Sequence, residues 1–219
     1  MPTSTLEEYL ESIYKLSQRG PVRPTQIADS VGVSGPTVTA TLRRLEAQGL
    51  VSRQGTKVVL TDEGLKRSLD IVRRHRIAET FLVDTLHLDW NAAHEEACKL
   101  EHALSPRVLA ALEEFLGDPV VCPHGHPIPN ADGSIADPAG RPLCDVAPGA
   151  SALVLSVAED DELVLGYLGD LGLRPGARAT VVESAPFQGP LTIEIDGIRT
   201  AIAREIARLV TVQAVAERV

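Results

Sequence analysis

A helix, a glycine-containing turn and a second helix follow one another in residues 24–48, and this pattern restricts the fold more than any other. Residues 24–31 are predicted to form the first of the two helices, and Gly32 marks the turn. Residues 37–48 form the second, with Ser34 as its cap and Pro36 in the first turn, where proline is tolerated. A preceding helix is expected to end near Ser17. Together they predict a helix-turn-helix.

A β-hairpin is predicted directly after these helices. Gly49 ends the second helix, and residues 50–60 read as two short strands that turn at Gln54-Gly55. A helix-turn-helix followed by a basic hairpin is a winged helix, in which the second helix of the motif enters the DNA major groove and the hairpin contacts phosphate. The expected DNA-contacting residues are Ser34, Pro36, Thr37, Thr39, Ala40, Arg43, Arg44, Arg53 and Lys57.

The helix that would enter the groove begins with small side chains. Hydroxyls can bond a base or a phosphate and methyl groups can touch thymine, but no Gln, Asn or Arg stands there for bidentate base reading. We therefore expect specificity from thymine contacts and DNA shape, and affinity from the four basic residues. The alternative for Thr37 and Thr39 is that they only cap and pack the helix.

The charge is unevenly divided along the chain. The protein carries a net charge of -9 over 219 residues, yet residues 1–76 hold 12 Lys and Arg against 8 Asp and Glu. This basic segment fits a surface that meets phosphate, attached to an acidic body. No apolar run is long enough to span a membrane and Met1-Pro2-Thr3 does not open a signal peptide, so we expect a cytoplasmic protein.

Candidate metal ligands lie on the helices that follow. Helices are predicted over residues 61–84 and 91–104, and another ends at Leu116. On the middle one, positions 94, 98, 101 and 102 are spaced i, i+4, i+7 and i+8 and share one broad face. His75 and Glu79 are spaced i, i+4 on the preceding helix, although such a pair is often only a surface contact. Apolar helices in this number also suggest a dimer.

Four segments are predicted. They are a winged helix-turn-helix domain (residues 1–72), a helical metal-binding and dimerisation domain (73–118), a Pro- and Gly-rich linker (119–149) and a small SH3-like β-barrel (150–219). Short strands separated by turns are expected in the last segment, over residues 152–157, 177–183, 191–195 and 200–203. The fold class is thus mainly α with β.

The residues carry a family resemblance over nearly the whole length. The chain resembles the diphtheria toxin repressor family, the iron- and manganese-dependent metalloregulators of bacteria, and its C-terminal part is similar to the SH3-like domain of ferrous-transport (FeoA-like) accessory proteins. The matching segments are residues 8–14, 33–38, 74–76, 94–98 with Glu101-His102, 127–129 and 168–176.

The resemblance implies two metal sites per subunit. The primary site would use Glu8, Cys98, Glu101 and His102, and the ancillary site His75, Glu79 and His94. The ancillary site would take further ligands from the SH3-like domain, and these would be Asp160, Asp161 or Glu162. The resemblance does not extend to the anion that some relatives bind beside an Arg matched by Arg76, because Cys122 and His126 replace the Ser and Asn that assist it there. We expect Glu11 to be a solvated residue rather than to bond a metal-bound water.

The ligand types point to two metals. The Glu8 carboxylate favours Mn(II), whereas the softer Cys98 thiolate favours Fe(II), Co(II), Ni(II) or Zn(II). We favour Mn(II), with Fe(II) as the alternative. The resemblance implies a homodimer that represses metal-uptake genes from a palindromic operator, with one or two dimers per operator.

Other functions fit parts of the sequence less well. His94 to Cys98 differs from the HExxH zinc-protease motif only at its last residue, but a metallohydrolase would leave the winged helix without a purpose, so we expect no enzyme. A second alternative is a winged-helix regulator that responds to a small organic ligand. His124, His126, Cys122 and Cys144 lack a CxxC pair, which disfavours a zinc knuckle.

Overall fold

A computed structural model describes residues 4–136, 140–158 and 162–215. Asp160 and Asp161 fall outside these ranges, as does the side chain of Glu162. The described elements are α1 (Ser4–Ser17), α2 (Pro24–Val31), α3 (Gly35–Ala47), β1 (Val51–Gln54), β2 (Lys57–Leu60), α4 (Asp62–Thr80), η1 (Phe81–Thr85), α5 (Trp90–Leu100), α6 (Pro106–Leu116), β3 (Arg141–Pro142), η2 (Leu143–Asp145), β4 (Ser151–Val157), α7 (Glu162–Asp170), β5 (Arg178–Ser184), β6 (Leu191–Ile195), β7 (Ile198–Ile202), α8 (Arg204–Arg208) and β8 (Val210–Ala214).

The chain divides into two compact units. Unit 1 comprises residues 1–75, 100–105 and 129–135, and unit 2 comprises residues 76–99, 106–128 and 136–219. Helices α4 and α5 each run through a boundary between the units. Among the described residues, no helix is both long enough and apolar enough to cross a membrane.

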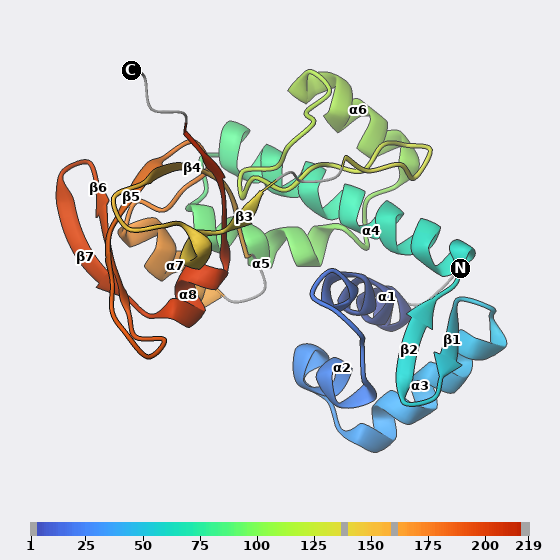
Figure 1. Ribbon diagram of the computed structural model, residues 1–219. Coiled ribbons are helices and arrows are strands. Elements are labelled where there is room, and N and C mark those ends of the chain that lie inside the picture. Colours follow the sequence, from blue (N-terminus) through green and yellow to red (C-terminus); the bar gives the residue numbers. More distant parts are fainter. Residues whose placement is uncertain (1–3, 137–139, 159–161, 216–219) are drawn as a thin grey trace. The chain divides into compact units, whose positions relative to one another are not determined.

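Unit 1 contains the predicted winged helix (Figure 1). One apolar core joins α1, α2, α3 and the hairpin, and Leu10, Ile27 and Leu42 are fully buried in it. Strands β1 and β2 pair antiparallel from Val51↔Leu60 to Gln54↔Lys57, and Gly55 turns between them with φ +64°. Glycine is needed at Gly64 for a different reason, because an added Cβ would lie 1.9 Å from the Leu50 carbonyl oxygen.

The helix predicted over residues 61–84 is α-helical over a shorter range than predicted. Helix α4 stops at Thr80 and continues as the π-helical turn η1, where the Leu86 N–H donates to the Phe81 carbonyl oxygen at 3.2 Å. A π-helical turn widens the backbone by one residue, so the apolar spacing of the sequence no longer marks the helix end. The next helix, predicted over residues 91–104, is also shorter, since α5 ends at Leu100.

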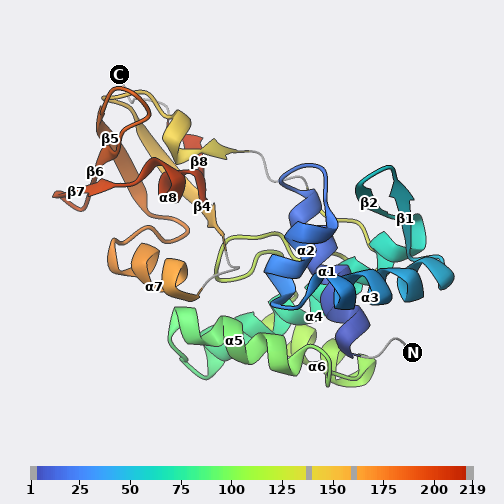
Figure 2. The ribbon, with the colours of Figure 1, turned by 90° about the horizontal axis from the view of Figure 1, so that it is seen from below.

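Unit 2 ends in a β-domain, which we define as residues 140–158 and 162–215 (Figure 2). Its sheet has the order β3-β8-β4-β5-β6-β7, with antiparallel pairing throughout. Buried residues of the strands, of α7 and of η2 form one core, which includes Leu143, Leu165 and Val181. Residues 141–146, inside the predicted linker, therefore contribute a strand and core residues to the β-domain.

Candidate functional site

The residues predicted to contact DNA lie in unit 1 and are accessible to solvent. All of its predicted residues are exposed except Thr39, which is half-buried. The Oγ of Ser34 and the Oγ1 of Thr37 lie 2.8 Å apart, and the Thr39 hydroxyl donates to the Gly35 carbonyl oxygen at 3.0 Å. The helix start therefore presents small hydroxyls that are partly engaged by the helix itself.

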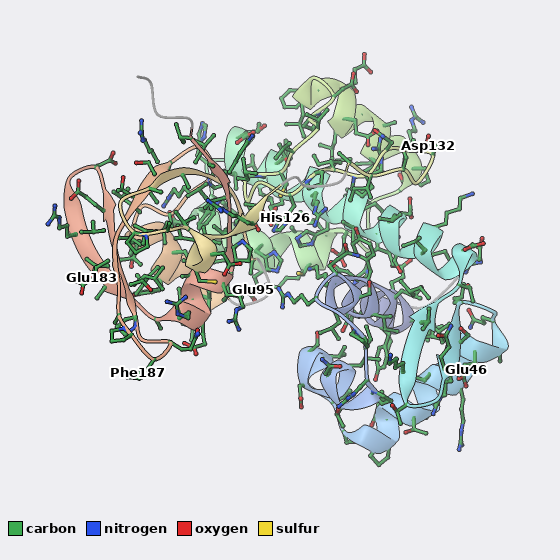
Figure 3. All side chains as sticks on the ribbon, viewed as in Figure 1. Glu46, Glu95, His126, Asp132, Glu183 and Phe187 are labelled. Atoms are coloured by element: carbon green, nitrogen blue, oxygen red, sulfur yellow. The ribbon has the colours of Figure 1, made fainter. Side chains whose placement is uncertain are left out.

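The hairpin carries two exposed basic residues, Arg53 and Lys57, and Arg53 is ion-paired. Nε of Arg53 lies 2.8 Å from Oε1 of Glu46, which Figure 3 labels on α3. Both side chains are substantially exposed, so the pair contributes little to stability. It ties the hairpin to α3 and lets Arg53 keep further donors for phosphate.

A buried acidic cluster lies in unit 1, and we call it the α1 cluster: Glu11 of α1, His75 of α4 and Glu101. Their ligand atoms lie within 4.8 Å of one another, and all three residues are buried. Nδ1 of His75 is 2.7 Å from Oε2 of Glu101, while Lys15 lies 3.0 Å from Glu11. The expectation that Glu11 is solvated was wrong, because this side of α1 is covered: Glu11 is only 8% exposed.

His102 sits beside this cluster in a second network. Its Nδ1 lies 2.7 Å from Oε2 of Glu7, and its Nε2 lies 3.3 Å from Oε1 of Glu101. Arg74 reaches Oε1 of Glu7 at 3.2 Å and donates to the Glu101 carbonyl oxygen at 2.8 Å. Glu8, the predicted primary ligand, is exposed. The carboxylate of α1 that reaches His102 in unit 1 is thus that of Glu7.

In unit 2, Glu79 lies among several potential ligands. Nδ1 of His94 is 3.2 Å from Oε1 of Glu79, and Nε2 of His94 is 3.8 Å from Sγ of Cys98. The structure therefore brings predicted ancillary ligands Glu79 and His94 together with Cys98, which was predicted for the primary site. Each predicted set draws residues from both units.

Two further potential ligands of unit 2 were not in either predicted metal site. Cys122 and His124 come from the loop after α6, and with Glu79 they form what we call the loop cluster: their ligand atoms lie within 4.8 Å of one another and all three residues are buried. The Pro- and Gly-rich composition of residues 119–149 suggested a linker, and the missing CxxC pair disfavoured a metal site for these two residues. The signal available in the sequence was a Cys and a His two residues apart.

The hydrogen bonds of His124 define which nitrogen faces the cluster. Its Nε2 lies 3.1 Å from the Trp90 carbonyl oxygen, which can only accept, so Nε2 carries the proton. Nδ1 then offers a lone pair and lies 2.9 Å from Oε1 of Glu79; among the described residues no group bonds it in hydrogen-bonding geometry. A lone pair and a carboxylate oxygen this close repel unless a proton or a cation lies between them. The donor set thus fits a metal cation.

Three residues considered in the sequence for an anion site or a zinc knuckle have other partners. Arg76 donates to the Pro127 carbonyl oxygen at 2.7 Å, and Nε2 of His126 donates to that of Val157 at 2.7 Å. Both side chains thus bind backbone carbonyl groups, and the structure gives no support for an anion site formed by them. Cys144 is buried in the core of the β-domain, where burial, and secondly the Asp145 carboxylate, raise the pKa of its thiol above the ordinary value.

Comparison with known families covers most of the chain. Residues 1–59 match the iron dependent repressor N-terminal DNA binding domain, residues 61–130 match the iron dependent repressor metal binding and dimerisation domain, and residues 141–214 match the FeoA domain. The FeoA match coincides closely with the β-domain, and the first match spans the winged helix.

Similar proteins extend over the full length. The chain is 36% identical to the iron-dependent repressor IdeR of Mycobacterium tuberculosis (strain ATCC 25618 / H37Rv), covering 96% of this chain and 97% of that protein. It is 31% identical to the diphtheria toxin repressor of Corynebacterium diphtheriae, covering 95% and 96%. A solved manganese-dependent transcriptional repressor in complex with manganese is 34% identical, with a TM-score of 0.90 over 96% of this chain and 100% of that chain. The chain therefore belongs to the diphtheria toxin repressor family of metal-dependent, DNA-binding transcriptional regulators, and it is not an enzyme.

Proposed function

We propose that Mn(II) activates this regulator by binding to the α1 cluster and the loop cluster, and that the loaded homodimer represses metal-uptake genes. The observation that carries the proposal is the α1 cluster, in which two buried carboxylates converge on a buried imidazole. Carboxylate ligands suit Mn(II), while imidazole is shared by several metals. The Cys122 thiol of the loop cluster is softer, so Fe(II) is the second candidate.

The α1 cluster offers a route from metal to DNA within unit 1. Without a cation, Glu11 and Glu101 are two carboxylates in a buried space, and Lys15 supplies one compensating charge. A metal bound there would neutralise both carboxylates and fix α1 against α4. Because α1 shares its core with α3, fixing α1 restricts the helix that reads DNA. A coupling free energy of about 1–3 kcal/mol would be enough for a graded switch.

A protein that binds a palindromic operator needs a twofold dimer interface, and we place this interface on α6. Phe81, Val108, Leu112 and Phe115 line an open apolar groove of about 430 Å³ in unit 2, in which Phe115 is 66% exposed. Apolar surface of this kind marks an interaction site, and a twofold axis would pair the groove with itself. Two recognition helices held about 34 Å apart would then read a palindromic operator.

The test is a metal titration of DNA binding. A duplex is first selected from a random pool with the Mn(II)-loaded protein, and its affinity is then measured by fluorescence anisotropy under anaerobic conditions with Mn(II), Fe(II) or chelator. Binding should rise at least tenfold with metal, about the lower part of the range for allosteric coupling, and vanish with chelator. Binding that ignores metal overturns the proposal, and activation at lower free Fe(II) than Mn(II) overturns the choice of Mn(II).

A matched pair of variants locates the effect. Glu101→Gln removes a charge from the α1 cluster and should abolish metal-dependent binding. Glu63→Gln makes the same change at a carboxylate of α4 whose side chain is 55% exposed and pairs with the exposed Arg67, and it should leave the titration unchanged. An unchanged titration in Glu101→Gln would remove the α1 cluster from the switch.

A further inference from the structure

Trp90 is the only tryptophan of the chain and stands next to the loop cluster. It begins α5, is 8% exposed and belongs to the same apolar core as the β-domain.

Three contacts join Trp90 to the loop. Its backbone carbonyl oxygen accepts the hydrogen bond from Nε2 of His124 at 3.1 Å, and its indole N–H donates to the Pro123 carbonyl oxygen at 3.2 Å. The rings of Trp90 and His124 lie 4.5 Å apart between centroids, at 45°. The imidazole can therefore neither turn over nor shift away from the indole, and the nitrogen left to face Glu79 is Nδ1.

The β-domain contacts Trp90 through other groups. The guanidinium carbon of Arg174 lies 5.2 Å from the centre of the indole ring, within the range of a cation–π contact. Gly169 of α7 is so close that an added Cβ would lie 3.4 Å from the Trp90 ring and 3.3 Å from Arg174. Trp90 is thus in contact with the His124 ring and with the β-domain at the same time.

The same loop is also seated on β4 by its backbone. The Val157 N–H donates to the His124 carbonyl oxygen at 3.1 Å, and His126 donates to the Val157 carbonyl oxygen at 2.7 Å. Gly125, with φ +86°, fits only because it has no Cβ, which would lie 1.9 Å from the Leu155 carbonyl oxygen. The loop therefore has one position on the β-domain, and Trp90 fixes the histidine within it.

We infer that Trp90 is the positioning residue of the loop cluster: it selects Nδ1 of His124 as the ligand atom and makes the seating of the β-domain part of the metal affinity. This rests on the proposed function, since it requires the loop cluster to bind a cation. Groups that orient a metal-bound histidine change metal affinity about 10- to 100-fold when they are removed.

The experiment uses Co(II) as the probe in the full-length Cys98→Ser protein. Cys122 is then the cysteine of the loop cluster that can give a thiolate-to-Co(II) absorption band, and Cys122→Ser must remove the band. Trp90→Leu removes the ring, and Trp90→Phe keeps a ring but loses the indole donor. Ile193→Ala weakens the same core away from His124 and serves as the control for stability.

We expect the Co(II) affinity to fall about 10-fold in Trp90→Leu, the lower end of the range for such groups because the backbone acceptor of His124 remains, and less in Trp90→Phe. Ile193→Ala should lower the melting temperature and leave the affinity and the band unchanged. Arg174→Gln removes the contact of the β-domain with the Trp90 ring and should lower the Co(II) affinity. At a subsaturating Co(II) concentration, less metal is then bound and the emission of Trp90 should be quenched less. A folded Trp90→Leu or Trp90→Phe protein that binds Co(II) as tightly as its parent overturns the inference. A parent protein without a Cys122-dependent band instead overturns metal binding at the loop cluster itself.

Discussion

Oε2 of Glu7 lies 2.7 Å from Nδ1 of His102, so the carboxylate that α1 presents to this histidine belongs to Glu7 and not to its exposed neighbour Glu8. Arg74 holds the other oxygen of Glu7 at 3.2 Å. This arrangement directs Nδ1 toward a carboxylate and leaves Nε2, 3.3 Å from Glu101, as the nitrogen available to a metal. Carboxylate–histidine–metal triads have this form.

The first prediction separates the two glutamates. Glu7→Gln should weaken Mn(II)-dependent DNA binding about tenfold or more, because Glu7 orients His102, whose Nε2 lies 3.3 Å from Glu101 of the α1 cluster and could join it as a ligand. Glu8→Gln is the matched control, with the same change one residue along. Fluorescence anisotropy of DNA binding against free Mn(II) measures the effect. A larger loss in Glu8→Gln would restore the ligand predicted from the sequence and leave Glu7 a structural residue.

The fold of unit 1 could be predicted because its signals are local. Gly32, Pro36 and Gly55 mark turns that depend on a few adjacent residues, and the hairpin pairs neighbouring segments. The end of α4 was not predictable in this way, since the π-helical turn η1 arises within an apolar run whose spacing still looks helical.

The residues of the two clusters were predicted only in part, for a reason of packing. Helical spacing and family resemblance singled out His75, Glu79, His94 and Glu101, which lie on regular helices or directly after one. Cys122 and His124 reach Glu79 only through the seating of an irregular loop on β4, a long-range contact with no periodicity. Glu11 was misjudged because α1 is covered on more than one side, so that even Ser12 beside it is 7% exposed.

The second prediction concerns the cysteines. Burial raises the pKa of Cys144, so less thiolate is present at neutral pH, and thiolate is the reactive form. Cys98 is only half-buried. Iodoacetamide should therefore alkylate Cys98 before Cys144 in the native protein, as followed by peptide mass spectrometry, and urea should remove the difference. Faster labelling of Cys144 under native conditions would contradict the burial of that thiol.

The third prediction tests the hairpin. Lys57→Ala should weaken DNA binding nearly equally on all sequences, and should reduce the slope of log affinity against log salt by about 1. The slope changes because the complex makes one phosphate contact fewer and therefore releases fewer counterions on binding. Arg199→Ala, which removes an exposed cation of β7, should leave the slope unaltered. Equal slopes for wild type and Lys57→Ala would remove the hairpin lysine from the DNA interface.

The fourth prediction tests the dimer face through Phe115. Burying a phenylalanine contributes about 1.5–3 kcal/mol, and a twofold interface buries it twice. Phe115→Glu should therefore raise the dimer dissociation constant about 100-fold or more, since about 1.4 kcal/mol corresponds to tenfold. Sedimentation velocity at several concentrations measures this shift, and operator binding should fall with it at saturating Mn(II). Phe187→Glu is the control, because Phe187 is fully exposed in the turn between β5 and β6 (Figure 3). A Phe115→Glu protein that stays dimeric at low concentration would place the twofold interface outside the α6 groove.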